Sequence, residues 1–350
     1  MKIRIAMLDS DRSYLNRIQS VFENRYSENL ELYTFTDTEQ AISEIVKNRI
    51  SVLLVSDSID FDMFLVPTRC TAVYFVESPK VDSINGVQAV CKYQKPDLIY
   101  KQIQSIYAEK NDVNVVFRSQ NGNAKIIAFQ SPCGGCGTST AAAACALHYA
   151  KLGKKTIYLN LEANGIAETY FHGAGQSTLR DVITTMQMGR NLFLKLESYV
   201  KQDRGVDYYA QSQAALDMVE FSDEDILSLT ELIEKEGNYD VIVLDLDFSL
   251  KNSSVAILRM ANAIVWVGNG SRECNAKLLR AYESLEILEQ KQEFPLMNRM
   301  TLIHNRSGGN VELSDAVEVR HILRIPNLSG TTEQVMEQMA LMPQFDQILE

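Results

Sequence analysis

The sequence predicts an α/β protein of two domains, and three observations support this. At 350 residues the chain is long enough for about two domains of ordinary size. Residues 1–110 alternate strand-like and helix-like runs, as flavodoxin-like folds do. Residues 125–350 open with an apolar run, a glycine-rich loop and a helical run, which is the order of a P-loop nucleotide-binding domain. Residues 111–124 are mostly polar and rich in asparagine, so we predict a linker there.

The composition excludes several classes of protein. A hydrophobic fraction of 46% and a charged fraction of 23% are typical of a globular chain. A net charge of −11 argues against binding to nucleic acid, whose phosphate backbone needs a basic surface. No run approaches the ~20 apolar residues of a transmembrane helix, and the N-terminus turns acidic too early for a signal peptide. Six cysteines are too few for a disulfide framework. We therefore expect a cytoplasmic protein without membrane insertion.

The first domain is predicted from short apolar runs that alternate with runs of helical spacing. The helical spacing is clearest in the run whose apolar residues are Leu15, Ile18, Val21 and Phe22. The predicted strands are Ile3–Leu8, Leu30–Thr34, Val52–Val55 and Thr71–Val76, and the predicted helices are Ser13–Phe22, Thr38–Val46 and one that begins at Lys95-Pro96.

The second domain is predicted as a mainly parallel sheet that helices cover on both faces. Its strands are continuously apolar, which is typical of strands buried on both sides. Ser222 and Asp225 have the spacing of a capping box and predict a helix that runs through Ile233. The predicted strands are Ile126–Phe129, Thr156–Leu161, Val241–Leu244, Ala263–Val267, Met300–Ile303 and an edge strand at Ile322–Pro326, and a further helix is predicted within Gly175–Ile183.

The glycine-rich loop, Cys133–Gly137, has the composition of a phosphate cradle. Glycine lets several backbone N–H groups face one anion, and the N-terminus of the following helix adds its positive dipole end. A P-loop carries GK[ST], but this loop continues Gly137-Thr138-Ser139 and so lacks the lysine that reaches the phosphates. Cys133 and Cys136 also form a C-x-x-C pair, a pattern of redox or metal sites. We interpret them as small residues that fill loop positions, with a redox or metal role as the alternative.

Residues 1–110 resemble the response-regulator receiver domain. Asp9 and Asp11 lie where that family has its acidic pair, and Lys95-Pro96 matches its last motif. The phosphoacceptor position falls on Ser56, and Asp57 lies one residue late, which turns its side chain to the other face of a strand. The resemblance therefore implies a receiver-shaped domain that is not phosphorylated. The alternative is that Asp57 accepts the phosphoryl group through a shifted strand end.

Residues 125–350 resemble the MinD/ParA superfamily of deviant P-loop ATPases. Residues Cys133–Ser139 stand where that family has KGGxGK[ST], and Glu162 stands where it has a water-orienting aspartate. Asp245 follows an apolar strand, as a Walker B carboxylate does, and Asn305-Arg306 matches the asparagine-led motif that reads adenine. The resemblance implies ATP or ADP and Mg²⁺ as cofactors and a homodimer as the assembly.

A receiver-like domain ahead of such a module resembles the CpaE/TadZ branch, the localisation proteins of Tad pilus assembly. That branch often has GGxGxST, and Gly134–Thr140 reads GGCGTST. The chain departs from the superfamily at Cys133, where the signature lysine would stand. The resemblance implies partners in pilus assembly or secretion and recruitment to a cell pole or the inner membrane face.

The predicted site joins the loop to three later segments. Ser139 and Asp245 are predicted to hold Mg²⁺, and Glu162 and Asp245 are the catalytic candidates. Without the lysine, binding loses a charge-assisted hydrogen bond of about 1.5–3 kcal/mol, and hydrolysis loses roughly 10³ or more in rate. The predicted nucleotide-binding residues are Cys133, Gly134, Gly135, Cys136, Gly137, Thr138, Ser139, Thr140, Asn305 and Arg306.

The leading functional hypothesis is an ATP-binding localisation or scaffold protein with slow or absent hydrolysis. Its receiver-like domain would serve protein interaction. Two alternatives stay open: an active partition-type ParA/MinD ATPase and a phosphorylation-controlled response regulator. The missing lysine and the acidic charge disfavour the first, and the serine at the acceptor position disfavours the second.

Overall fold

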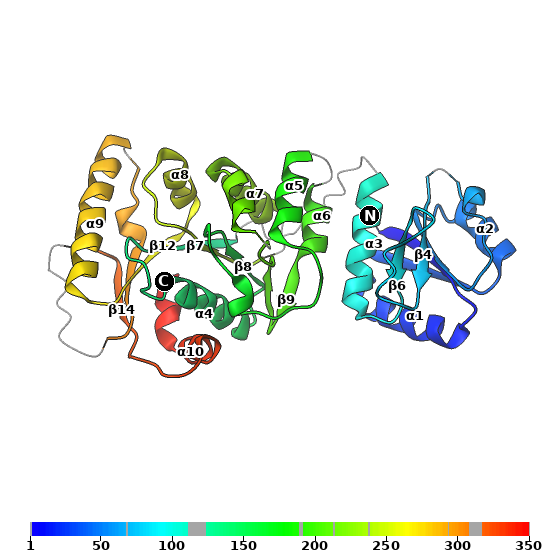
Figure 1. Cartoon of the computed structure of the whole chain (residues 1–350), viewed down its shortest axis with the longest axis horizontal. Coiled ribbons are helices and arrows are strands. Elements are labelled where there is room, and N and C mark those ends of the chain that lie inside the picture. Colours follow the sequence, from blue (N-terminus) through cyan, green and yellow to red (C-terminus); the bar gives the residue numbers. More distant parts are fainter. Residues whose placement is uncertain are drawn as a thin grey trace. The chain divides into compact units, whose positions relative to one another are not determined.

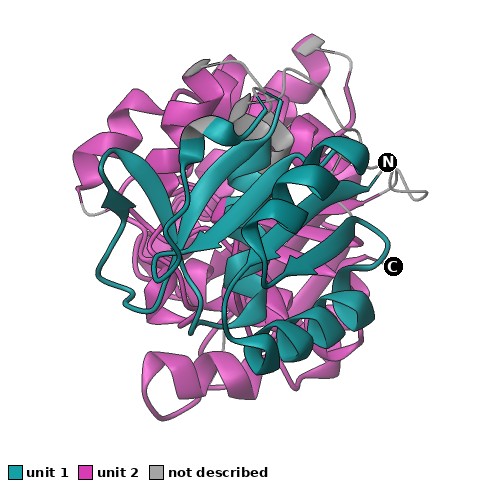
Figure 2. Ribbon diagram, turned by 90° about the vertical axis from the view of Figure 1, so that its right-hand side faces the viewer, with its two compact units in different colours: residues 1–117, 189–198 teal, residues 118–188, 199–350 magenta. Residues whose placement is uncertain are grey.

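The computed structural model describes residues 2–67, 69–110, 124–188, 192–212, 214–236, 239–292, 294–307 and 317–349. It divides into two compact units (Figure 2): Met1–Phe117 with Gly189–Ser198, and Arg118–Met188 with Tyr199–Glu350. Of the predicted linker, all but Ala124 lies outside the described residues. Residues 192–198, which the sequence analysis placed in the second domain, belong to the first unit, where Gln104 Nε2 donates to Glu197 Oε2 at 3.0 Å.

The described residues of the first unit form a six-stranded sheet in the order β2-β1-β3-β4-β6-β5. Neighbouring strands are parallel except for β5 and β6. This α/β sheet confirms the predicted fold class, and the predicted strands lie within one residue of the observed ones. The strands are β1 (Ile3–Leu8), β2 (Leu30–Phe35), β3 (Val52–Ser56), β4 (Thr71–Val76), β5 (Ser83–Ile84) and β6 (Val87–Cys91).

Helices cover both faces of this sheet. On one face, α1 (Arg12–Tyr26) and α3 (Pro96–Lys110) pack into a common core, to which α1 contributes Leu15, Ile18 and Phe22. On the other face, α2 (Thr38–Lys47) packs through Ala41 and Ile45 (Figure 1). Three of the four residues in the apolar pattern that predicted α1 are therefore buried, whereas Val21 is only half-buried.

Two connections of the first unit lack the helix that a βα series would have. The described part of the β3–β4 connection holds the short 3₁₀ turn η1 (Met63–Leu65). Between β4 and β6 the chain forms the β5–β6 hairpin, whose two turn residues, Asn85 and Gly86, have φ values of 50° and 80°. Asn-Gly with both residues at positive φ makes a tight two-residue hairpin turn. The sequence analysis did not use this signal.

The described residues of the second unit form an eight-stranded sheet in the order β14-β13-β12-β7-β11-β8-β10-β9. All pairs are parallel except β9 with β10. The predicted strands are present, with β14 at the edge as expected, whereas the β9–β10 hairpin was not predicted. The strands are β7 (Lys125–Gln130), β8 (Thr156–Asn160), β9 (Lys201–Asp203), β10 (Val206–Tyr208), β11 (Val241–Asp245), β12 (Ala263–Gly268), β13 (Met300–His304) and β14 (His321–Arg324).

Helices α4 and α10 lie against one face of this sheet, and α7 and α8 lie on the other (Figure 1). Ala141, Ala142, Ala143 and Ala144 of α4 are fully buried, because small side chains let this helix approach the central strands closely. In the described residues no helix is both long and apolar enough to cross a membrane. The described helices of this unit are α4 (Thr138–Lys151), α5 (Leu179–Met188), α7 (Asp223–Glu236), α8 (Asn252–Met260), α9 (Arg272–Gln292) and α10 (Thr332–Met339). Helix α6 (Leu192–Tyr199) belongs to the first unit except for its last residue.

Candidate functional site

The candidate site lies at the carboxyl ends of the central strands of the second unit. The glycine-rich loop leaves β7, which lies between β12 and β11, and leads into α4. In the register of the sheet, Asp245 at the end of β11 is paired with Phe129 of β7 and with Asn160 at the end of β8. Ligands of open parallel sheets bind at this edge, where helices leave in both directions. The motifs from distant segments therefore meet where a ligand site is expected.

The loop has the backbone conformation of an anion cradle. Gly137 caps α4 with φ 85°, Gly135 has φ 73°, and no side chain caps the first turn of the helix. A Cβ on Gly137 would lie 2.4 Å from Asn305 Nδ2, so both the conformation and the space require glycine there. The N-terminal amides of α4 thus remain available to phosphate oxygens.

Asn305 supports the loop from the end of β13. Its side chain is buried, Nδ2 donates to the carbonyl oxygen of Cys136 at 2.8 Å, and Oδ1 accepts from the amide of Arg306 at 3.0 Å. Arg306 itself is exposed and has φ 60°. These two hydrogen bonds are enough to explain an asparagine at this position, whether or not its side chain contacts a nucleotide base. The contact of Asn305-Arg306 with adenine stays a prediction.

Ser139, Glu162 and Asp245 come together as the motifs suggested. Ser139 Oγ donates to Glu162 Oε2 at 2.8 Å, which joins the first turn of α4 to the segment after β8. Burial raises the pKa of Glu162. Asp245 is fully buried, and this burial, with the nearby charge of Glu162, raises its pKa to about 8. Two carboxyl groups of raised pKa beside one hydroxyl are a site that favours an added positive charge.

Asp245 is held by two polar residues of β8. Its Oδ2 accepts from Tyr158 Oη at 2.8 Å and from Asn160 Nδ2 at 3.4 Å. Its Oδ1 is buried and makes no hydrogen bond within the described part of the chain. A carboxylate oxygen without a partner, a second carboxylate and a hydroxyl are oxygen ligands of the kind that Mg²⁺ prefers. The residues therefore fit a divalent cation, which Ser139 and Asp245 would hold.

The loop supplies no positive side chain. Thr138 is the first residue of α4, where the motif would carry lysine, and residues 131–140 (SPCGGCGTST) contain neither lysine nor arginine. An anion in this loop would be held by backbone amides, the helix dipole and a bound cation. Binding of phosphate groups by the loop stays a prediction, and residues 131–140 would add no side-chain charge to a transition state.

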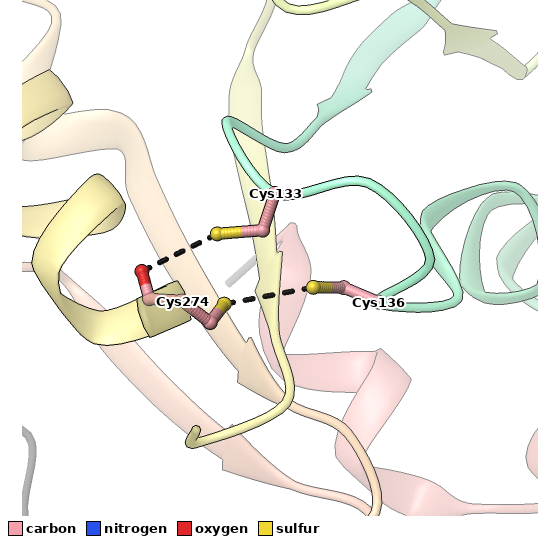
Figure 3. A group of neighbouring side chains, drawn as sticks. All are labelled: Cys133, Cys136 and Cys274. Atoms are coloured by element: carbon pink, nitrogen blue, oxygen red, sulfur yellow. Dashed lines mark hydrogen bonds between the residues drawn. The ribbon is translucent and has the colours of Figure 1, made fainter. Parts of the chain in front are cut away.

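Three cysteines surround the start of the loop. Cys133 and Cys136 come from the loop, and Cys274 comes from the first turn of α9 (Figure 3). Cys133 Sγ donates to the carbonyl oxygen of Cys274 at 3.3 Å, and the Sγ atoms of Cys136 and Cys274 are 3.5 Å apart. The hydrogen bond between these two thiols raises the pKa of Cys136 and lowers that of Cys274. The sequence analysis missed Cys274, because no local pattern links it to a loop 138 residues away.

The first unit has its own buried polar pair, between β1 and β6. Asp9, which follows β1, accepts from Lys92 Nζ at 3.2 Å, and both side chains are at least 95% buried. Lys92 also contacts Glu77 Oε1 at 3.2 Å. Burial opposes the charge of Lys92, but these two partners more than offset it and raise its pKa. The lysine that reaches the acidic turn is thus Lys92, whereas Lys95 is exposed. Lys92 directly follows the buried end of β6, and this position was the signal that the sequence analysis overlooked.

Ser56 and Asp57 lie as the sequence alignment placed them. Ser56 ends β3, is fully buried, and its Oγ lies 2.9 Å from Ser58 Oγ. Asp57 is exposed. The strand end therefore presents a serine hydroxyl at the buried position, and the nearest aspartate points to solvent. That the domain is not phosphorylated stays a prediction, and acceptance of a phosphoryl group by Asp57 stays the alternative.

Comparisons with known proteins agree with both halves of this description. Residues 1–108 match the family model described as TadZ-like, receiver domain. No curated protein matches the chain. The ParA family ATPase of Chlorobium tepidum TLS is 16% identical to it with a TM-score of 0.51, over 63% of this chain and 99% of that chain.

Two further solved structures show lower similarity. The septum site-determining protein MinD of Pyrococcus horikoshii OT3, in complex with Mg-ADP, is 15% identical with a TM-score of 0.46, over 62% of this chain and 95% of that chain. A plasmid partition protein of Borrelia burgdorferi B31, bound to AMPPNP, is 18% identical with a TM-score of 0.44, over 65% of this chain and 97% of that chain. The family model over residues 1–108 and the fold of the Chlorobium tepidum protein together describe the chain as a TadZ-like receiver domain followed by a domain with the ParA fold.

Proposed function

From a TadZ-like receiver domain followed by a domain with the ParA fold, we propose an ATP-binding localisation protein of Tad-type pilus assembly or secretion. The protein binds Mg-ATP and hydrolyses it slowly or not at all. One observation carries this proposal. The loop keeps its backbone cradle and its cluster of Ser139, Glu162 and Asp245, but it has Thr138 in place of the lysine.

Each residue of the site has a role that follows from its contacts. The amides at the N-terminus of α4 bind the phosphate groups, and Asn305 keeps the loop in place through Cys136. The hydroxyl of Ser139, which donates to Glu162 in this structure, and the unpartnered oxygen of Asp245 would hold the cation. When bound, Mg²⁺ neutralises part of the phosphate charge. Glu162 is then free to orient a water molecule, although no side-chain cation in the loop assists the transfer.

The proposed assembly is a homodimer in which two subunits enclose nucleotide. The receiver-like domain acts as an interaction module, because Lys92 pairs with Asp9 and the acceptor position holds Ser56. Its partners are proteins of the pilus or secretion machinery, and these partners recruit the protein to a cell pole or to the inner membrane face. Light scattering should show a dimer when Mg-ATP is added, and a protein that stays monomeric at saturating nucleotide would count against this assembly.

Isothermal titration of the full chain with ATP, with and without Mg²⁺, tests the central proposal. We expect one nucleotide per chain, with binding that depends on Mg²⁺ and weakens when Ser139 is replaced by alanine. Leu152→Ala, at the exposed C-terminal end of the same helix, is the matched control and should bind as the wild type does. If neither ATP nor ADP binds in the presence of Mg²⁺, the proposed function is wrong.

Turnover measurements separate this proposal from its two alternatives. Phosphate release at saturating ATP should be slow or undetectable. Fast turnover stimulated by DNA would instead identify an active partition-type ATPase. Stoichiometric binding of beryllofluoride at Asp57 would identify a phosphorylation-controlled receiver and overturn the role proposed for the first domain.

A further inference from the structure

The three cysteines beside the loop form a cluster that the proposed nucleotide site does not use. Their sulfur atoms all lie within 4.8 Å of one another, and all three side chains are buried. In Figure 3 the thiols of Cys133 and Cys136 point from the loop toward the start of α9, where Cys274 lies. We propose that this cluster is a three-thiolate binding site for a soft cation of the Zn²⁺ or Cu⁺ class.

The spacing of the sulfur atoms fits such a cation. With Zn–S bonds of about 2.3 Å, two thiolates on a tetrahedral ion lie about 3.8 Å apart. Cys136 and Cys274 are 3.5 Å apart, and the whole cluster spans no more than 4.8 Å. Each sulfur therefore needs to move by less than about 1 Å to reach bonding distance. Thiolates select soft cations over Mg²⁺, so this site and the oxygen site at Asp245 do not compete for one ion.

A helix N-terminus and an exposed lysine lie beside the cluster. Cys274 lies in the first turn of α9, and thiolates are stabilised at helix N-termini. The exposed Lys277 lies one turn further along the same helix and places a positive charge near Cys133. Three sulfur ligands leave one position of a tetrahedral ion open, and a three-coordinate ion needs no fourth.

The third thiol distinguishes this proposal from a disulfide. A disulfide between Cys136 and Cys274 would require the sulfur atoms to close from 3.5 Å to about 2.05 Å, and it would leave Cys133 unused. Cys133 instead points into the same cluster and bonds to the backbone of Cys274. A cation uses all three sulfurs at once.

A bound cation would tie the nucleotide loop to α9. Cys133 and Cys136 flank Gly134 and Gly135, so two of the ligands lie within the phosphate cradle itself. Fixing them would restrict the loop in the part that Asn305 already holds from the other side. The cation would thus set the shape of the cradle, and this consequence, but not the metal site itself, rests on the proposed function.

Titration of the reduced full chain with Co²⁺ under anaerobic conditions tests the site. Thiolate-bound cobalt gives charge-transfer absorption in the near ultraviolet, which we expect to saturate at one Co²⁺ per chain and to vanish when Zn²⁺ is added. A parallel titration with Cu⁺ distinguishes the two cations by their relative affinity. The assay needs no nucleotide, so its failure leaves the proposed ATP binding intact.

The cysteine variants decide the outcome. Cys274→Ser should weaken Co²⁺ binding by about 100-fold or more, since even outer partners of a metal site are worth about 10–100-fold. Cys145→Ala, a buried cysteine of α4 outside the cluster, is the control and should bind as the wild type does. Cys133→Ser provides a second test if Cys274→Ser does not fold by circular dichroism. Absence of the absorption, its survival in both cluster variants, or a Cys136–Cys274 disulfide in place of metal binding would each overturn the proposal.

Discussion

Asp245→Asn tests the claim that the second unit buries a carboxyl group that stays protonated near neutral pH until a cation binds. Asp245 is fully buried at the end of β11, and its pKa is raised from 3.8 to about 8, chiefly by burial. A difference of about 4 in pKa corresponds to ~6 kcal/mol between the ionised and neutral forms, at 1.36 kcal/mol for each unit. Asparagine has the same shape and cannot ionise.

The sign of the pH dependence follows from the direction of this shift. Between about pH 5 and pH 7.5 the folded protein keeps a proton that the unfolded chain releases. The free energy of unfolding therefore falls as the pH rises, by about 1.4 kcal/mol per pH unit from this group, and levels off above the folded pKa. The variant lacks this slope. Its stability relative to the wild type should grow by ~3 kcal/mol between pH 5 and pH 7.

Urea denaturation followed by tryptophan fluorescence measures this difference. The single tryptophan, Trp266, is buried in β12 and so reports the second unit alone. Glu283→Gln, the same kind of change at an exposed carboxylate of α9, is the control for an added amide group. Saturating Mg-ATP should stabilise the wild type more at pH 8 than at pH 6, because the cation needs the ionised carboxylate, and should stabilise the variant little. Parallel pH profiles for wild type and Asp245→Asn would refute the reasoning.

Three further substitutions test other parts of the structure. Lys92→Met leaves the buried Asp9 without its partner and should destabilise the first unit by about 3–5 kcal/mol; thermal unfolding by circular dichroism measures it, and an unchanged melting temperature would contradict the buried ion pair. Gly137→Ala places a Cβ 2.4 Å from the side-chain amide nitrogen of Asn305, on a backbone with φ 85°. It should lower the free energy of unfolding by about 1–3 kcal/mol and abolish ATP binding in isothermal titration. A variant that binds ATP normally would rule out the cradle. Thr138→Lys should tighten ATP binding by about 1.5–3 kcal/mol, whereas Leu152→Lys, at the far end of the helix, should not; equal effects would show only a general influence of charge.

Most of the fold could be predicted because its elements are encoded locally. In both units the continuously apolar runs became strands within one or two residues of their predicted bounds, as Val52–Ser56 and Val241–Asp245 show. Buried parallel strands need such runs, and the Ser222–Asp225 pair does cap α7 through a bond from Asp225 N to Ser222 Oγ at 3.2 Å. The β9–β10 hairpin was missed because its strands have only three residues each and show no periodicity. The β5–β6 hairpin was missed because the Asn-Gly turn signal was not used.

The sequence predicted those parts of the candidate site in which a single residue within a local motif determines the chemistry. Glycine at position 137 and a carboxylate at the end of β11 can be read from local motifs, and so can the absence of a lysine at Thr138. No local pattern shows that Tyr158 and Asn160 hydrogen-bond to that carboxylate. Nor does one show that Asn305 donates to the loop carbonyl of Cys136, or that Lys92 reaches Asp9 of the first unit.

The cysteine cluster shows most clearly which features local sequence predicts and which features only the tertiary structure determines. The chain order places Cys133 and Cys136 in a loop, and from that alone they are small residues that fill it. Cys274 joins them because β12 lies beside β7 in the sheet, so that the segment after β12 returns to the loop after β7. Strand order is decided by the packing of the whole sheet, and local sequence does not record which strands become neighbours. Motifs therefore identify the phosphate cradle, whereas only the assembled sheet brings a third thiol to it.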